Sequence, residues 1–197
     1  MPEQSQKPSR RQQILHTLAQ ELENSPGQRI TTASLAKAVG VSEAALYRHF
    51  PSKAKMFEGL IEFIEETIFG LYSKIISEIP SSRERCEKML MVLLTFAEKN
   101  PGLTRILVGD ALTGETERLG IRVVQFFDRT ESQFKQVLRE GNLANELIRE
   151  LNINASANLM LAVAEGRMNQ YVRSRFKQMP TSEWKGQWQL ISKMIFN

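Results

Sequence analysis

Apolar residues recur at a helical spacing along most of the chain. Ile14, Leu18 and Leu22 are spaced for one face of a helix. This predicts a helix that begins near Gln12 and stops before Pro26. Residues 33–39 and 43–50 predict two further short helices, separated by a glycine.

A longer helix is predicted from Lys53 to just before Pro80. Its apolar stripe consists of Phe57, Leu60, Ile61, Ile64, Ile68, Leu71, Tyr72, Ile75 and Ile79. Phe63 lies about 100° around the helix from Ile64 and therefore falls off this stripe, while Phe69 and Ile76 fall on a further side. The helix thus has more apolar surface than one core requires.

The remaining pattern predicts helices to the end of the chain. Residues 89–97 are apolar nearly all round, as expected of a central buried helix. The later predicted elements are a short helix at 103–112, a glycine-rich loop at 109–120, a helix at 121–140 with Val124 and Phe127 in its apolar pattern and Gly141 after its end, and helices at 155–177 and 183–196. Because no segment alternates like a strand, we expect an all-α protein of about nine helices with a seam near residue 51.

The composition is that of a globular protein, because 42% of the 197 residues are hydrophobic and 24% are charged. The single cysteine, Cys86, excludes an internal disulfide and a CxxC zinc site. The sequence holds no run of 18 apolar residues, and its first residues lack the apolar segment of a signal peptide. We therefore expect a cytoplasmic protein.

The net charge of +4 is unevenly distributed. Residues 1–58 hold eight Lys and Arg against five Glu, whereas the rest of the chain holds eighteen basic and seventeen acidic residues. An anionic partner is therefore expected to dock on the first third of the chain. An ordinary solvated surface is the alternative that charge alone leaves open.

Residues 30–53 have the anatomy of a helix-turn-helix. Thr31 or Thr32 is placed to cap the first helix, and a Gly40-Val41-Ser42 turn, with Val41 expected to be buried, separates it from the second. In such a unit the second helix enters the DNA major groove, and small residues near its start let the backbone approach the bases. Ala44 and Ala45 meet that requirement.

Hydroxyl, cationic and small side chains in this unit are the candidate DNA contacts. We predict that the contacts are Arg10, Arg11, Thr31, Thr32, Ser42, Glu43, Ala44, Ala45, Tyr47, Arg48, His49 and Lys53. Arg10 and Arg11 are expected in a flexible arm before the first helix. Arg48 suits either a phosphate or a guanine, and His49 suits either a phosphate or a helix cap. Leu46 and Phe50 are expected to pack in the core.

The run from Val41 to Lys53, VSEAALYRHFPSK, resembles the signature of the TetR family of dimeric bacterial DNA-binding proteins. That resemblance implies a three-helix DNA-binding domain and a helical C-terminal domain that dimerises through its last two long helices, here residues 155–177 and 183–196. Trp184 and Trp188, which share a helix face, are expected in the dimer core.

Further stretches resemble a subgroup of that family that acts in nucleoid occlusion. These are residues 57–66, 98–107, 172–174 and 176–177. The resemblance implies a protein that binds palindromic chromosomal sites and, when DNA-bound, engages FtsZ and disrupts its polymers. Phe63, Lys99 and Asn100 are the expected FtsZ contacts, with Lys99 standing where the subgroup has arginine. Phe63 packed against the DNA-binding domain is the alternative. Residues 109–120 depart from the subgroup and lack its methionine-phenylalanine pair.

The expected organisation is a mobile tail at 1–9, a DNA-binding domain at 10–52 and a helical dimerisation and partner-binding domain at 53–197. We expect no enzyme activity, metal, cofactor or small-molecule ligand, because the chain lacks a nucleophile set, metal spacing or phosphate loop. Basic residues between Arg167 and Lys177 are interpreted as helix C-terminal charges or as a further contact. The alternative function is that of a repressor whose C-terminal domain binds a small molecule.

Overall fold

The computed structural model describes residues 9–197, and within them the chain is all-α, as predicted. The helices are α1 (Arg10–Asn24), α2 (Thr32–Val39), α3 (Glu43–His49), α4 (Lys53–Glu78), α5 (Ser82–Lys99), α6 (Pro101–Leu107), the 3₁₀ helix η1 (Asp110–Leu112), α7 (Glu117–Leu143), α8 (Ile153–Arg173) and α9 (Trp184–Lys193). The only β contact among residues 9–197 is an isolated bridge between Leu147 and Phe196.

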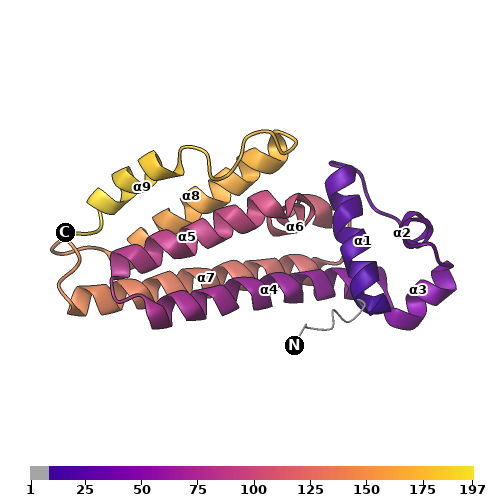
Figure 1. Cartoon of the computed structure of the whole chain (residues 1–197), viewed down its shortest axis with the longest axis horizontal. Helices are drawn as coiled ribbons and strands as arrows, with labels where there is room; N and C mark the ends of the chain where they lie inside the picture. The colour runs from indigo at the N-terminus through magenta and orange to yellow at the C-terminus, as the bar shows by residue number, and fades with distance from the viewer. Residues whose placement is uncertain (1–8) are drawn as a thin grey trace, which may run out of the picture.

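The molecule is elongated, with α1, α2 and α3 at one end and a helical body behind them (Figure 1). In the body, α4 and α7 pack side by side, and α5 packs against α4, α7 and α8. The C-terminus lies at the end of the body away from α3 (Figure 1). Each described helix is too short or too polar to span a lipid bilayer.

The start of α1 corrects two expectations. Ser9 is an ordered N-cap, because its hydroxyl accepts from the Gln12 backbone N–H at 3.2 Å and the Gln12 side chain accepts from the Ser9 N–H at 2.8 Å. Arg10 and Arg11 therefore lie in the first turn of α1 and not in an arm before it. The rest of the predicted tail lies outside the described residues.

The body confirms the central place of the predicted apolar helix at 89–97. Within α5, the buried residues are Ser82, Cys86, Met89, Leu90, Leu93, Leu94, Phe96 and Ala97. In α4, Leu71 is exposed although it belongs to the predicted stripe, and Phe69 is buried. Phe69 packs on Tyr72 and on Phe126 of α7, with ring centroids 6.0 and 5.5 Å apart, because α7 covers this second side of α4.

Helix α7 differs from its prediction in length and in orientation. It begins at Glu117, so that part of the expected loop is helical. Its buried face runs through Val123 and Phe126, whereas Val124 is 58% exposed. Gly141 lies inside the helix and does not terminate it; a Cβ there would stand 2.7 Å from the Ser82 hydroxyl. Close approach between α7 and α5 is thus the reason for that glycine.

The last helices are shorter than predicted, and the two tryptophans are used differently. Trp184 and Trp188 do share a face, and their rings stack with centroids 6.1 Å apart. Both rings are buried within their own chain, where Trp188 also packs on Phe196. The expectation that they form a dimer core is therefore wrong.

The junction between the two ends of the molecule is the contact of α1 with α6. Gly102 is buried against the α1 backbone, and a Cβ there would stand 2.1 Å from the Ala19 carbonyl oxygen. Beside it, Arg105 is only 1% exposed. Its guanidinium donates to the carbonyls of Leu22 at 2.6 Å, of Ser25 at 2.9 Å and of Gln28 at 3.5 Å, and its Nε donates to the Asp110 carboxylate. A buried cation thus ties α6 to the end of α1.

Candidate nucleic-acid interface

The first helix of the predicted unit begins at a complete capping box. Thr31 Oγ1 accepts from the Ser34 N–H, and Ser34 Oγ accepts from the Thr31 N–H, each at 3.1 Å. Thr31, and not Thr32, is therefore the N-cap. The Thr31 side chain remains exposed.

The turn depends on Gly40. Its φ of 75° and ψ of 37° lie in the left-handed region, which other residues rarely adopt. The Val41 N–H returns to the Ala36 carbonyl at 3.0 Å, and Val41 is half-buried where the sequence predicts burial. Ser42 then caps α3 by accepting from the Ala45 N–H at 3.2 Å. These bonds fix the angle between α2 and α3.

Helix α3 turns one residue inward and the predicted contact residues outward. Leu46 is buried, as is Phe50 directly after the helix. Ala45 is half-buried; the exposed residues of this stretch are Ser42, Glu43, Ala44, Tyr47, Arg48 and His49. The outward surface of α3 and its cap therefore carries six of the twelve side chains that the sequence proposes as DNA contacts.

The two arginines at the start of α1 have different surroundings. The Arg11 guanidinium lies over the Phe50 ring, 4.2 Å from its centroid, and donates to the His49 carbonyl at 3.4 Å. It therefore helps to hold the end of α3 against α1. Arg10 is exposed.

Lys53, the last predicted contact, is engaged inside the chain. Its Nζ lies 2.6 Å from a carboxylate oxygen of Glu115, and it lies 5.5 Å from the centroid of the Phe57 ring. The sequence pattern did not indicate Glu115, which stands in the loop before α7, or Arg29, whose Nε lies 3.5 Å from the same carboxylate oxygen.

A second surface lies where α1, α4 and α6 meet. Phe63 is 48% exposed, as its position off the α4 stripe predicts. It lines a hollow of about 290 Å³ together with Asn100, Leu103 and His16, which we call the Phe63 hollow. The Asn100 side chain is fixed, because its amide donates to the Phe96 carbonyl at 2.8 Å.

An apolar groove between α4 and α5 adjoins this hollow at Asn100. The groove, of about 490 Å³, is lined by Leu71, Ile75, Lys88, Met91, Val92, Thr95, Phe96, Lys99 and Asn100. Lys88 and Lys99 are its two cations. We call this surface the α4–α5 groove.

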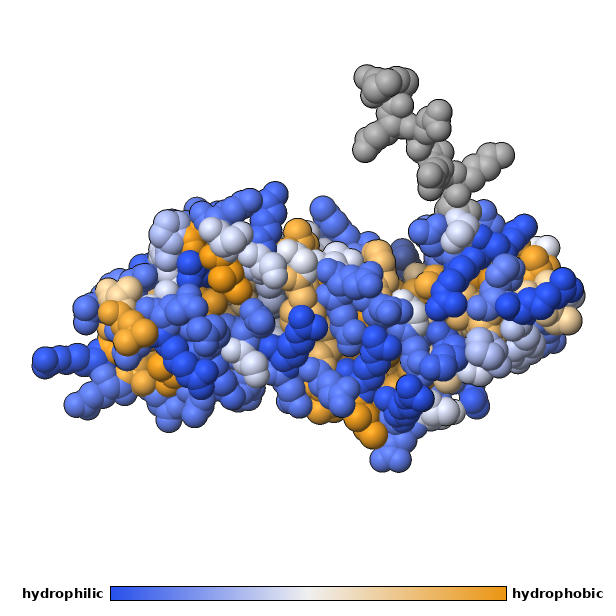
Figure 2. Space-filling view, turned by 90° about the horizontal axis from the view of Figure 1, so that it is seen from below, coloured by the Kyte–Doolittle hydropathy of each residue, from blue (hydrophilic) through white to orange (hydrophobic). Residues whose placement is uncertain are grey.

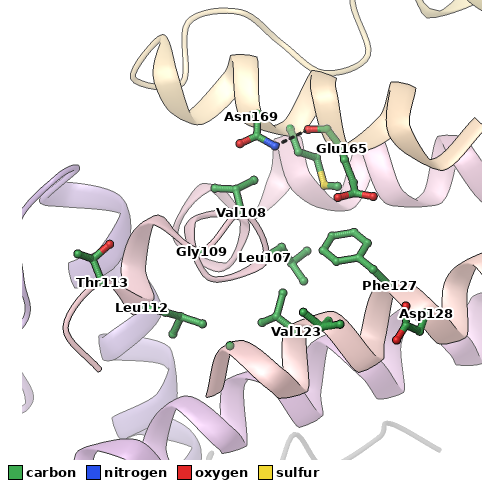
Figure 3. Close-up of a pocket in the computed structure, with 13 residues that line it drawn as sticks. Leu107, Val108, Gly109, Leu112, Thr113, Val123, Phe127, Asp128, Glu165 and Asn169 are labelled. Atoms are coloured by element: carbon green, nitrogen blue, oxygen red, sulfur yellow. Dashed lines mark hydrogen bonds between the residues drawn. The ribbon is translucent and has the colours of Figure 1, made fainter. Parts of the chain in front are cut away.

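A larger hollow lies elsewhere, between α6, η1, α7 and α8, with a volume of about 560 Å³. Figure 3 shows Leu107, Val123 and Phe127 on its apolar side, and Glu165 and Asn169 on the helix opposite. Burial, and then the nearby Glu131 carboxylate, raise the pKa of Glu165. We call this feature the α7–α8 hollow.

Cys86 and Arg167, two further residues that the sequence singles out, are engaged within the fold. Cys86 is buried, and burial raises the pKa of its thiol. Arg167 donates to the carbonyls of Met179, Pro180 and Ser182, so it holds the connection from α8 to α9. Among residues 9–197, no group of three or more His, Cys, Asp or Glu side chains is placed to hold a metal ion.

The surface of the molecule is shown from one side in Figure 2. Hydrophilic side chains cover much of this face, and apolar side chains gather at the end away from α3 and at places along the body. The exposed large apolar residues include Leu143 at the end of α7, Leu159 in α8, and Leu190 and Met194 in and after α9.

The caps, the glycine turn and the outward face of α3 define an all-helical protein of the helix-turn-helix class.

Comparison with known proteins places the chain within that class. Residues 14–60 match the family described as bacterial regulatory proteins, tetR family, and residues 81–195 match a SlmA-like tetracyclin repressor-like C-terminal domain. The chain is 54% identical over 191 residues to the nucleoid occlusion factor SlmA of a Marinomonas species, covering 97% of each chain. It is 56% identical over 190 residues to the same-named protein of Shewanella amazonensis, covering 96% of each.

Solved structures agree on the fold. A TetR transcription regulator from Haloarcula marismortui has a TM-score of 0.79 at 15% identity, covering 95% of this chain and 98% of that one. The ketosteroid regulator KstR2 of Mycobacterium tuberculosis has a TM-score of 0.77 at 18% identity, covering 98% and 97%. The chain therefore belongs to the tetR family of bacterial regulatory proteins, in the group with a SlmA-like C-terminal domain.

Proposed function

We propose that this chain is a nucleoid occlusion factor: a sequence-specific DNA-binding homodimer that, when DNA-bound, binds FtsZ and disrupts its polymers. In this proposal residues 10–52 bind DNA and residues 53–197 dimerise and bind the partner, at the nucleoid in the cytoplasm. The observation that carries it is the similarity over nearly the whole chain to proteins named nucleoid occlusion factor SlmA.

The exposed face of α3 supports the DNA-binding part. Tyr47, Arg48 and His49 extend from it and offer hydroxyl, guanidinium and imidazole donors. Thr31 and Ser42, at the starts of α2 and α3, add hydroxyls that reach phosphate oxygens. The small side chains of Ala44 and Ala45 leave room for the bases.

DNA binding is tested by fluorescence anisotropy with a labelled duplex selected from a random-sequence pool by the wild-type protein. Affinity should fall steeply with salt, because each phosphate contact releases counterions. Tyr47→Ala should weaken binding about tenfold or more, because a contact in the docked face is lost. Leu143→Ala, at the far end of the body, is the control. Equal affinity of the two variants would remove α3 from the interface.

Exposed apolar residues on the last two helices support a dimer. Leu159 on α8, with Leu190 and Met194 in and after α9, face solvent in the single chain. We therefore assign the dimer contact to these outward faces and not to the tryptophans. Leu190→Glu should lower the mass measured by light scattering after size exclusion, while Lys185→Glu on the same helix should not.

The Phe63 hollow and the α4–α5 groove support the FtsZ part. An exposed aromatic ring is a good anchor for a partner. The groove beside it is apolar and carries Lys88 and Lys99, so it suits an extended peptide that has both apolar and acidic residues. Lys99 offers a point charge and not the bidentate fork of an arginine.

Sedimentation of FtsZ polymers, with and without the selected duplex, is the test of this part. The wild-type protein with DNA should reduce the sedimented FtsZ. Lys99→Glu should retain DNA affinity and lose the effect on FtsZ, while Lys185→Glu, a charge reversal on α9, should keep both. A Lys99→Glu protein that still disperses the polymers would exclude Lys99 from the site.

A ligand-responsive repressor is the second candidate function, and the α7–α8 hollow is the observation that favours it. The hollow combines an apolar side with Glu165, Asp128 and Asn169, as small-molecule sites do. The same sedimentation experiment separates the candidates, because a repressor of this kind leaves FtsZ polymers unchanged with or without DNA.

A further inference from the structure

Glu115 lies between two cations of the DNA-binding end of the molecule. One of its carboxylate oxygens stands 2.6 Å from Lys53 Nζ and 3.5 Å from Arg29 Nε. The Arg29 guanidinium also donates to the Gly114 carbonyl at 3.0 Å. The side chain of Glu115 is 8% exposed and that of Lys53 17%, so the pair is largely shielded from water. Salt therefore screens it less than it screens an exposed pair.

The position of these cations relates them to the docked face. Arg29 stands two residues before the Thr31 cap of α2, and Lys53 opens α4 four residues after the end of α3. Glu115 comes from a distant part of the sequence, the loop that joins α6 to α7. Gly109 and Gly114, with φ of 80° and 77°, give this loop its course.

A carboxylate and a DNA phosphate compete for the same cations, because both are oxyanions that accept charge-assisted hydrogen bonds. A negative charge near cations also lowers the positive potential that attracts DNA. Lys53 is therefore weakened as a phosphate contact for as long as Glu115 holds it. The Arg29 side chain is 66% exposed, so it has room to turn toward a phosphate when its bonds to Glu115 and to the Gly114 carbonyl break.

We propose that Glu115 is an internal counter-anion of the DNA-binding surface, which a DNA phosphate displaces from Lys53 and Arg29. This rests on the proposed DNA-binding function and adds its regulation. Displacement releases the loop at residues 109–116 from its anchor. That loop continues directly from α6, and Leu103 of α6 lines the Phe63 hollow. Binding of DNA therefore alters the proposed partner surface through the loop and α6.

The test is a comparison of Glu115→Gln with Glu117→Gln. Both substitutions remove one negative charge. Glu117 is the control, because it is exposed on the first turn of α7. In Glu115→Gln, the new amide keeps a hydrogen-bond acceptor beside Lys53 and loses only the charge. With the selected duplex, Glu115→Gln should bind about three- to tenfold more tightly at low salt. Its plot of log affinity against log salt should keep the wild-type slope, because Lys53 contacts a phosphate in both complexes; a slope steeper by about one unit would show that Glu115 keeps Lys53 in the wild-type complex and would contradict displacement.

A Lys53→Gln background shows whether the effect passes through the lysine. There, most of the gain from Glu115→Gln should disappear. Equal behaviour of Glu115→Gln and Glu117→Gln, or an undiminished gain without Lys53, would overturn the proposal. Failure of the wild-type protein to bind the duplex in a salt-dependent way would instead overturn the DNA-binding function itself.

Amide hydrogen exchange provides the readout of loop release. Adding the duplex to the wild-type protein should speed exchange at residues 113–116, and Glu115→Gln should show the faster exchange without DNA. Unchanged exchange in the loop of the DNA-bound wild-type protein would show that Glu115 keeps Lys53, and would contradict displacement.

Discussion

Helices α3 and α6 have seven residues each and opposite surroundings. Of α3, only Leu46 is buried, and every other position is exposed or half-exposed. Of α6, every residue after Pro101 is buried, including the charged Arg105. Isolated helices of this length are unstable in water, so each depends on its neighbours. Helix α3 is held by a cap and one apolar anchor, and α6 by contact on all sides.

The difference separates two uses of a short helix. The side chains of α3 do little for the chain's own packing, so they are available to an external partner. Those of α6 join the DNA-binding end to the body, through a backbone contact at Gly102 and the carbonyl bonds of Arg105. Changes in α6 should therefore alter stability, and changes in α3 should alter binding.

The largest effect is expected for Gly102→Ala. The added methyl would stand 2.1 Å from the Ala19 carbonyl oxygen, so α6 must move away from α1. We expect a loss of about 3 kcal/mol or more in the free energy of unfolding, measured with urea. Gly70→Ala in α4 is the control, because nothing lies within 4 Å of its added methyl and it should stabilise by up to about 1 kcal/mol.

Arg105→Met and Arg48→Met make the same exchange in the two helices. Arg105→Met leaves the carbonyls of Leu22 and Ser25 without their buried donor, and should cost about 2–4 kcal/mol. Arg48→Met should change stability by less than about 0.5 kcal/mol and weaken DNA binding. Similar urea midpoints for the two variants would contradict the contrast between α3 and α6.

The smallest effect concerns Glu165, in the hollow beside α6. Its raised pKa means that the folded state holds a proton more tightly than the unfolded chain, so its contribution to stability declines as the pH rises above about 4.5. Because the side chain is only half-buried, Glu165→Gln should raise the free energy of unfolding by less than about 1 kcal/mol at neutral pH. This gain should vanish below about pH 4.5, where the carboxyl is protonated in both states. Urea unfolding of both proteins at two pH values checks this, with Glu66→Gln as the control.

The sequence was sufficient to predict α3 and its surroundings, because the signals there are local. Ser42 as a cap, Gly40 as a left-handed turn and Leu46 as the buried anchor all act within a few residues of the helix. The position of Phe63 off the α4 stripe also followed from helical geometry, whereas its exposure was one of two alternatives that the sequence left open. In each case the periodicity of one segment contains the physical cause.

What the sequence did not reveal depends on contacts between distant segments. The partners of Arg105 are carbonyl oxygens some 80 residues earlier, and an arginine gives no sign of burial by itself. The pairing of Lys53 with Glu115 spans 62 residues. Val124 was assigned to the wrong face because α7 carries apolar residues on more than one side, and only the packing of α4 and α8 decides which side is buried.

The backbone contact at Gly102 has a consequence for the geometry of the operator. Because α1 packs directly on α6, the DNA-binding end is held rigidly on the body. In a dimer, the distance between the two α3 helices is therefore set by how the two bodies pair. Half-site spacing on DNA follows from that distance. With the proposed dimer contact on α8 and α9, the length of DNA between the two half-sites is encoded in the C-terminal helices, far from the proposed DNA contacts of α3.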